Sequence, residues 1–363
     1  MEWKNCTLGD VVMFQRGHDL PKGKMESGKF PVVGSNGIIG YHNKYTTESP
    51  SITIGRSGNV GKPFIYYGRT WSHNTTLYIK DFKGNDPVFV YYFLQTLGLS
   101  HFAGGSAVPT LNRNHIHALN VRIPNDVAEQ RRIGSILKTF DDKIEVNRKI
   151  NKNLQKQAKL LFKHKFVDIL SSQSEVPIGW HKGTVSEIIE LHDSKRIPLS
   201  KRTRSTLAKT YPYYGATSIM DYVDKFLFDG IYLLLAEDGT VIDSNGFPVL
   251  QYVSGKFWVN NHAHIITGKN GFSVELLYLL FSQINIQSIV TGAVQPKISQ
   301  ANLRKIPITI PSNYDIQELD LVIQPIFAQI RNLHAENDKL TTMRDSLLPK
   351  LISGEIDVSH VNI

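Results

Sequence analysis

The stretch that decides the fold is LKTFDDKIEVNRKINKNLQKQAKLL, residues 137–161. Apolar and amide side chains recur in it at alternating steps of three and four residues, the heptad pattern of a coiled-coil seam. Residues 323–347 carry the same alternation. The seam residues predicted in the two stretches are Leu137, Phe140, Ile144, Asn147, Asn151, Leu154, Ala158 and Leu161, followed by Ile323, Ile326, Ile330, Leu333, Asn337, Leu340, Arg344 and Leu347.

The two heptad stretches predict two long helices that pair with each other. Capping-box-like starts are expected at Asp126-x-x-Glu129 and at Asp315-x-x-Glu318, and Gly354 is a good helix stop. Pro325 is expected to start or kink the second helix. Because one chain supplies both helices after separate domains, an antiparallel pairing is the simplest geometry.

One detail of the seam leaves two alternatives open. A shift of 186 residues aligns Asn151 with Asn337. The two amides either form a buried pair that disfavours slipped registers or lie separately at a wet edge of the seam.

The sequence contains an internal duplication, in which the second half matches the first at a shift of about 180 to 187 residues. Residues 30–34 match 211–215, and residues 71–74 match 258–261. Each copy begins with short β-branched and aromatic segments separated by Gly and Asn, which predict strands. Examples are residues 50–54, 64–67, 76–79 and 231–235, and short helices are expected at residues 88–97 and 273–281.

These patterns predict an α+β fold in which two duplicated β-rich domains are separated and joined by two long antiparallel coiled-coil helices with pseudo-twofold symmetry. The expected segments are the first domain (1–125), the first long helix (126–172), the second domain (173–312), the second long helix (313–354) and a tail (355–363). Residues 171–177 are expected to link the two halves.

Composition narrows the classes of function. The chain has 363 residues and a formal net charge of +9, which favours polyanionic partners without singling out nucleic acid. The sequence contains no run of 18 apolar residues, so no membrane-spanning helix is predicted. The N-terminus lacks a signal-peptide pattern. Cys6 is the only cysteine, so an intrachain disulfide is excluded and a Cys-based zinc site is not expected. A bacterial-type cytoplasmic location is the default expectation.

Two motifs carry a family resemblance. The first is EQRRIGSIL, residues 129–137, followed by FDDKI, residues 140–144; the second is RDSLLPKLISGEI, residues 344–356. Together with the alternation of β-rich domains and long helices, they resemble the specificity subunit of a type I restriction-modification system. The resemblance covers essentially the whole chain, although the chain is somewhat short, which points to trimmed loops in the recognition domains.

The resemblance implies a non-catalytic subunit with two target-recognition domains, each reading one half of an asymmetric bipartite site in double-stranded DNA. The helices would act as ruler and docking platform for two methyltransferase (M) subunits and for restriction/translocase (R) subunits. This chain would hold no cofactor, and S-adenosylmethionine, ATP and Mg²⁺ would belong to the partner subunits.

Basic clusters are candidates for contacts with DNA phosphates. The first helix carries 11 Lys or Arg against 6 Asp or Glu between residues 126 and 168, which suits phosphates, an acidic partner or a plain solvated face. The densest cluster, residues 195–204, is broken by Pro and Ser and therefore favours a loop over a helix face. The phosphate-contact candidates are Arg16, Lys22, Lys24, Lys195, Arg196, Lys201, Arg202, Arg204 and Lys209.

Base reading requires side chains with fixed donor and acceptor geometry. Candidate loops are those that occupy equivalent places in the two copies but differ in their polar residues, since two different half-sites require different readers. Ordinary turn chemistry also explains the glycines in these loops. The base-reading candidates are Arg56, Ser57, Asn59, His73 and Asn74 in the first copy, and Glu237, Asp238, Thr240, Asn260 and Asn261 in the second.

Other chemical signals are weak. Gly55-x-x-Gly58 lacks the Lys-Ser/Thr of a phosphate loop. His115-x-His117 and His262-x-His264 would each present two imidazoles on one face of a strand, but no third ligand stands at a fixed spacing, so no metal site is predicted. A coiled-coil scaffold without DNA specificity is the main alternative function, and a self-contained nuclease or methyltransferase is the enzymatic one.

Overall fold

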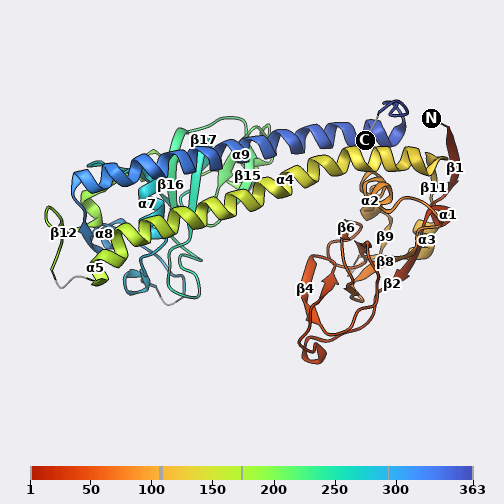
Figure 1. Ribbon diagram of the computed structural model, residues 1–363, viewed down its shortest axis with the longest axis horizontal. Helices are drawn as coiled ribbons and strands as arrows, with labels where there is room; N and C mark the ends of the chain where they lie inside the picture. Colours follow the sequence, from red (N-terminus) through yellow and green to blue (C-terminus); the bar gives the residue numbers. More distant parts are fainter. Residues whose placement is uncertain (1, 106–108, 173–174, 293, 362–363) are drawn as a thin grey trace. The chain divides into compact units, whose positions relative to one another are not determined.

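The computed structural model describes residues 2–105, 109–172, 175–292 and 294–361. They form two compact units, one of Met1–Val146 with Glu336–Ile363 and one of Asn147–Ala335. Each unit combines one β-rich domain with portions of two long helices, α4 (Val127–Phe162) and α9 (Asn313–Ser353) (Figure 1). The predicted α+β fold with two β-rich domains and two long helices is confirmed.

The first β-rich domain contains two larger sheets and two strand pairs, one of them β9 with β10. A four-stranded sheet has the order β2-β8-β5-β6, a three-stranded sheet has the order β4-β3-β7, and β1 pairs with β11. The bounds are β1 (Trp3–Thr7), α1 (Leu8–Val11), β2 (Met13–Arg16), η1 (Lys22–Lys24), β3 (Phe30–Gly34), β4 (Gly37–His42), β5 (Ser51–Gly55), β6 (Pro63–Tyr66), β7 (Trp71–Ser72), β8 (Thr76–Asp81), α2 (Pro87–Thr96), η2 (Leu99–Phe102), β9 (Ala103–Gly104), β10 (Thr110–Leu111), α3 (Arg113–His117) and β11 (Asn120–Pro124).

The second β-rich domain is built on one six-stranded sheet with the order β13-β18-β16-β17-β14-β15. The long strand β17 pairs with both β16 and β14. In the first domain two separate strands make the equivalent pairings, β6 with β5 and β7 with β3. The bounds are η3, a π-helical turn (Lys163–Val167), α5 (Asp168–Ser172), β12 (His181–Thr184), η4 (Val185–Glu187), β13 (Ile189–Leu191), η5 (Asp193–Lys195), α6 (Lys201–Arg204), β14 (Tyr211–Tyr214), β15 (Ile219–Val223), β16 (Phe228–Ala236), β17 (Leu250–Val259), β18 (Ala263–Gly268), α7 (Val274–Phe281), η6 (Gln287–Ile289), α8 (Gln300–Arg304) and β19 (Pro307–Ile310).

The duplication read from the sequence is present in the strand pairings. The β3–β4 hairpin shifts register between Val32 and Val33, and the β14–β15 hairpin shifts register at the matching place, between Tyr213 and Tyr214. The strands and short helices expected from the sequence lie within about one residue of their predicted places, apart from extensions of some strands. The two domains therefore share a scaffold down to the position of a β-bulge.

Within each unit, α4 and α9 lie side by side and run in opposite directions (Figure 1). In the first unit, Lys143 forms an ion pair with Glu336 at 3.6 Å, and Asp141, earlier in α4, accepts from Arg344, later in α9. In the second unit, Lys165 meets Glu318 at 3.3 Å. The predicted antiparallel pairing is confirmed in each unit.

The structure excludes the Asn151–Asn337 pair, one of the two alternatives left open for the seam, and corrects one predicted seam residue. The buried Asn151 side chain does not pair with Asn337; its Nδ2 lies 3.5 Å from the backbone oxygen of Ile330. Leu161 is exposed, and Phe162 is buried in its place, because the steps after Ala158 lengthen to four residues as α4 packs onto the core of the second domain. The remaining predicted seam residues are buried or half-buried.

The predicted span of the second long helix, residues 313–354, agrees with α9 to within one residue, whereas its alternative start at Pro325 and its predicted cap are corrected. The helix begins at Asn313, twelve residues before Pro325, and runs through that proline. The amide that the proline lacks would have bonded to the carbonyl of Leu321, a residue that is 77% exposed. The N-terminal cap is Ser312, whose Oγ accepts from the Asp315 amide at 3.2 Å, and not Asp315 itself. Gly354 ends the helix with a φ of +81°, as predicted.

The buried amide of Asn151 generates a stability prediction. Its Oδ1 has no hydrogen-bond partner among the described residues, and its Nδ2 contact is long. Asn151→Leu replaces a poorly satisfied polar group by an apolar one of the same branched shape, so we expect the free energy of unfolding to rise by about 1 kcal/mol. Chemical denaturation of the full chain measures this, with the exposed Asn153→Leu as the matched control. A loss of stability in Asn151→Leu would show that the amide is needed at the seam.

Candidate nucleic-acid interface

The strand pairings bring a set of polar residues to equivalent places in the two domains. Gly55 pairs with Thr76 in the first domain, and Ala236 pairs with Ala263 in the second, so Arg56 and Glu237 follow equivalent strand ends. The Leu111 amide donates to the Arg56 carbonyl and the Ile298 amide donates to the Glu237 carbonyl, both at 2.8 Å. The equivalent pairs are Arg16 and Asp193, Arg56 and Glu237, Leu77 and His264, Thr110 and Lys297, and Arg113 and Gln300.

In the first domain these positions line an open polar groove. The groove has a volume of about 590 Å³ and contains three arginines, Arg16, Arg56 and Arg113. Its other lining residues are Gln15, Leu77, Gly104, Thr110, Leu111, Asn112 and His115. The arrangement concentrates hydrogen-bond donors and positive charge in a concave surface.

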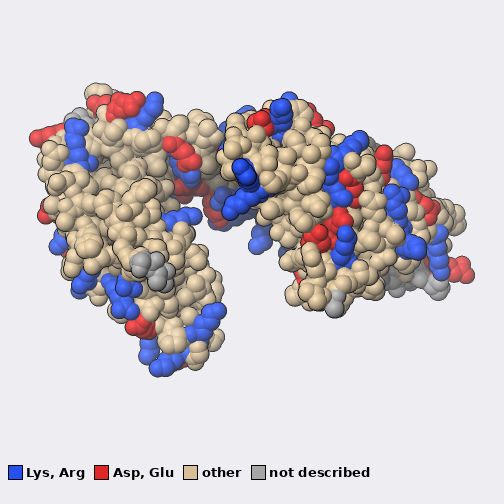
Figure 2. Space-filling model, turned by 180° about the vertical axis from the view of Figure 1, so that it is seen from behind, with Lys and Arg blue, Asp and Glu red and all other residues tan. Residues whose placement is uncertain are grey.

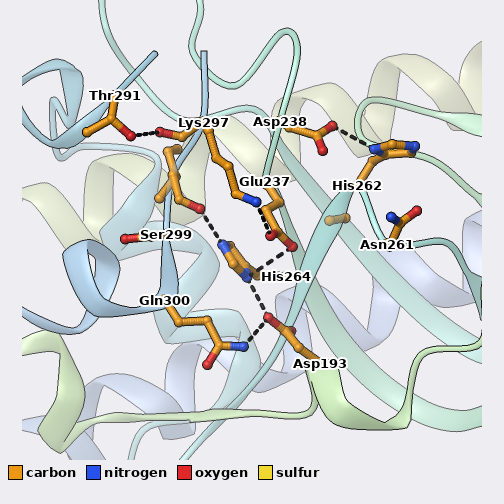
Figure 3. A network of polar contacts seen from close by, with 12 residues as sticks. Asp193, Glu237, Asp238, Asn261, His262, His264, Thr291, Lys297, Ser299 and Gln300 are labelled. Carbon is orange, nitrogen blue, oxygen red and sulfur yellow. Dashed lines mark hydrogen bonds and ion pairs between the residues drawn. The ribbon is translucent and has the colours of Figure 1, made fainter. Parts of the chain in front are cut away.

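In the second domain the same positions are filled by a network of ion pairs (Figure 3). Glu237 accepts from Arg196 at 2.6 Å and lies 3.2 Å from the Lys297 ammonium. Asp193 accepts from the Gln300 amide at 2.6 Å. The charged side chains at these positions are therefore paired within the second domain, whereas the arginines of the first domain face an open groove.

His264 lies at the centre of this network and is fully buried. Its Nδ1 is 2.6 Å from the Asp193 carboxylate, and its Nε2 is 2.8 Å from the backbone oxygen of Ile298. The ring thus shares one hydrogen bond with the Asp193 carboxyl and another with a backbone carbonyl. These two contacts, together with the Glu237 carboxylate 3.8 Å from Nδ1, hold the ring in place.

The Asp193 carboxyl has a lowered pKa. Burial alone would raise the pKa, but hydrogen bonding and charge attraction from His264, the Ile265 amide and the Arg196 charge together lower it. Asp193, Glu237 and His264 offer ligand atoms within 4.8 Å of one another, as a metal site would. Those atoms already face Arg196, Lys297, Gln300 and a carbonyl, so the donor set fits an ion-pair network and not a metal centre.

The other histidine motif takes no part in such a network. His115 and His117 lie on the short helix α3 and not on a strand. His117 accepts from the Phe14 amide at 3.0 Å, and burial lowers its pKa. This is a packing role.

The predicted phosphate contacts divide into exposed and internally paired residues. Arg196 and Arg204 are mostly buried and bind acidic side chains and carbonyls of their own domain, and Lys209 binds Asp221 at 2.8 Å. Part of the cluster predicted to be a loop is the short helix α6, because Ser200 caps it by accepting from the Thr203 amide. The exposed candidates are Arg16, Lys22, Lys24, Lys195, Lys201 and Arg202. Figure 2 shows basic side chains gathered at the far end of the domain that carries β4.

The predicted base readers also divide. Asn260 is buried, where its Oδ1 accepts from the His262 amide at 2.8 Å, so it shapes the turn. Asp238 binds His262 at 2.7 Å at the edge of the network. His73 shares a hydrogen bond with Thr75 inside its own turn, and the Asn74 side chain donates to Asp19. The candidates left accessible are Arg56, Ser57, Asn59, Thr240 and Asn261, with Glu237 largely enclosed.

Sequence reasoning missed Arg113, Lys297, His264 and Gln300 as members of the equivalent sites. A signal was available, because residues 110–113 match residues 297–300 at a shift of 187 and a capping residue, Asn112 or Ser299, stands in each.

Comparison with known proteins decides the family. A model described as the type I restriction modification DNA specificity domain matches residues 1–156 and 177–342, one match for each half. The chain belongs to this family. Its relatives are specificity subunits, the non-catalytic members of type I systems, whose catalytic activity lies in partner subunits.

Individual relatives are distant. A putative type I restriction enzyme specificity subunit of Haemophilus influenzae is 34% identical over 146 residues, which cover 40% of this chain and only 36% of that protein. The MjaIX specificity subunit of Methanocaldococcus jannaschii is 24% identical over 75% of this chain and 70% of its own length. A crystal structure of the type I S subunit from M. genitalium shares the fold, with a TM-score of 0.62 at 18% identity over 97% of this chain and 96% of that one.

The helices of this specificity subunit carry no membrane-spanning signal. Within the described ranges, none combines the length and the apolar character needed to cross a bilayer.

The network around His264 generates a stability prediction. Asp193→Asn leaves the buried Arg196 guanidinium and the buried His264 ring with one carboxylate fewer, so we expect a loss of about 3 kcal/mol at neutral pH. The lowered pKa of folded Asp193 means that its ionised form contributes stability fully above about pH 4, and that this contribution is lost as the pH falls through the lowered value.

Denaturant unfolding of the full chain between pH 3 and pH 7 measures both effects. The wild-type chain should lose stability on acidification more steeply than Asp193→Asn, and the exposed Asp229→Asn is the matched control. Equal pH profiles for wild type and Asp193→Asn would contradict the network.

Proposed function

We propose that this specificity subunit reads an asymmetric bipartite DNA site, with one half-site read by each β-rich domain. The observation that carries the proposal is the pair of equivalent sites. Three arginines stand in the first domain where Asp193, Glu237 and Gln300 stand in the second. A shared scaffold with different polar side chains at one place is what two domains need in order to recognise different bases.

We further propose that the long helices dock M and R subunits. In the second unit, α9 exposes the apolar side chains of Tyr314, Leu321 and Val322, which are 74%, 77% and 50% exposed. Leu321 also lines a groove of about 630 Å³ together with Gly271 and Pro325. Exposed apolar groups beside a groove favour a protein partner over solvent. The duplication favours two M subunits, one for each half of the chain.

In this proposal the partner subunits supply the chemistry and its cofactors, S-adenosylmethionine, ATP and Mg²⁺, and the complex acts on DNA in the cytoplasm. A scaffold without DNA specificity explains the helices, but it gives no reason for opposite charges at equivalent sites. A self-contained enzyme would turn over DNA without partners.

A domain exchange tests the proposal. Replacing residues 1–125 by those of a relative should change one half of the methylated site and leave the other half intact, because each domain is built on its own core. Methylome mapping of a host that carries the chimera reports both halves. The matched control is an exchange of residues 173–312, which should change the other half. A single exchange that altered both half-sites would contradict modular reading.

The exposed part of the basic cluster tests the role of phosphate contacts. Lys201→Ala with Arg202→Ala should weaken binding to all sequences without changing the preferred one, since phosphate contacts position the protein but carry no base information. Each lost contact should reduce the slope of log affinity against log salt by about 0.9, so by about 1.8 for both.

Binding of the assembled complex to duplex DNA at several salt concentrations measures the slope. Lys152→Ala with Lys156→Ala on α4 removes the same charge outside both β-rich domains and serves as the control. An unchanged slope in the first double variant removes α6 from the DNA interface.

A further inference from the structure

The groove of the first domain holds guanidinium groups that its own side chains do not neutralise. Arg16 has an ion pair with Asp19, at 3.5 Å and largely exposed. In the part of the chain that the structure describes, Arg56 and Arg113 have no ion-pair or hydrogen-bond partner for their side chains. Two rigid forks of N–H donors therefore face a concave surface with their hydrogen-bonding capacity unused.

Arg56 is mounted on a backbone with little freedom. Its amide donates to the Thr75 carbonyl and its carbonyl accepts from the Leu111 amide, both at 2.8 Å. The residue before it must be Gly55, because a Cβ there would lie 1.8 Å from the Asn59 carbonyl oxygen. This close approach fixes where the arginine leaves the strand end, which is the property a specific reader needs.

Arg113 is fixed in a similar way from the other side of the groove. It is the first residue of α3, and Asn112 caps that helix by accepting from the Asn114 amide at 3.0 Å. Ile116, one turn further on, is buried in the core of the first domain. Two arginines from different elements thus converge on one groove.

The second domain shows what keeps this groove open. There, Arg196 forms ion pairs with Asp193 and Glu237. The buried His264 lies where the first domain has Leu77. Leu77 needs no counter-ion, and in the first domain the equivalents of both acids are themselves arginines. The first groove therefore has no internal anion at these positions and must take its anion or acceptor from a ligand.

The lining favours a base edge over a phosphate. Gln15 and Asn112 add planar amides beside the two guanidinium groups, and Leu77 and Leu111 add an apolar floor. Guanine presents two acceptors, O6 and N7, along its major-groove edge, which match the fork of an arginine. Phosphates, by contrast, are met by exposed flexible cations such as Lys22 and Lys24.

We infer that the first domain recognises guanine in its half-site through Arg56 and Arg113. The inference rests on the proposed function and deepens it by naming the base and its readers. It also implies a difference between the domains, because the second domain closes the same place with its own ion pairs.

The test uses the full chain assembled with the M subunits of its host, and duplex DNA carrying the mapped methylation site. Each guanine of the first half-site is replaced in turn by 7-deazaguanine, which lacks the N7 acceptor. At least one replacement should weaken wild-type binding about tenfold. Arg56→Lys and Arg113→Lys keep the charge but lose the fork, so at least one of them should bind the normal site about tenfold more weakly and no longer respond to 7-deazaguanine at that position.

Lys80→Gln is the control, because Lys80 is exposed on β8 of the same sheet and does not line the groove. It should keep the wild-type response to 7-deazaguanine, and unfolding midpoints should show that all variants are folded. The inference is overturned if the first half-site contains no guanine, if both Lys variants discriminate as the wild type does, or if they lose affinity equally for all sequences. Failure of the proposed function would look different, since the wild-type complex would then not prefer its mapped site over a scrambled duplex.

Discussion

Both β-rich domains complete their cores with apolar side chains from the two long helices, and the rest of the structure depends on this packing. Ile133 and Leu137 of α4 and Leu351 and Ile352 of α9 belong to the core of the first domain. Phe162 of α4 and Ile323, Phe327 and Ile330 of α9 belong to the core of the second. A helix that serves both a seam and a domain core cannot slide without exposing buried apolar area, at a cost of roughly 25 cal/mol for each Å². The strand ends that carry the polar sites are positioned by these cores.

On this shared scaffold, one buried position separates the chemistry of the two domains. Leu77 in the first domain needs only apolar neighbours. His264 in the second is a buried polar ring, so the positions around it must supply polar partners, and they do so as Asp193 and Glu237. The equivalent residue Arg56 is free to serve a ligand because its side chain has no partner among the described residues, and Arg16 has only an exposed ion pair with Asp19. Charges at neighbouring positions therefore change together, and a single substitution between the two types would leave an unpaired charge.

The sequence was sufficient to predict the architecture but not the network of polar contacts around His264. The heptads and the matches between the two copies predicted the long helices, the duplicated domains and the equivalence of Arg56 with Glu237, because these depend on local periodicity and on order along the chain. Of the two alternatives for Asn151, the pair with Asn337 is excluded. A shift of 186 residues relates equivalent positions of two copies, whereas antiparallel helices bring together positions that move in opposite directions, as Asn151 and Ile330 do. The role of His264 could not be predicted, because its partners Asp193 and Ile298 lie 71 and 34 residues away.

The central claim is that equivalent strand ends of two similar domains face different halves of one DNA site. A cryo-EM structure of the complex with M subunits on its methylation site tests this most directly. The account predicts that residues 55–59 lie against base edges of one half-site and residues 236–240 against base edges of the other. A structure in which these residues face solvent or a protein subunit, while other loops contact the bases, would contradict it.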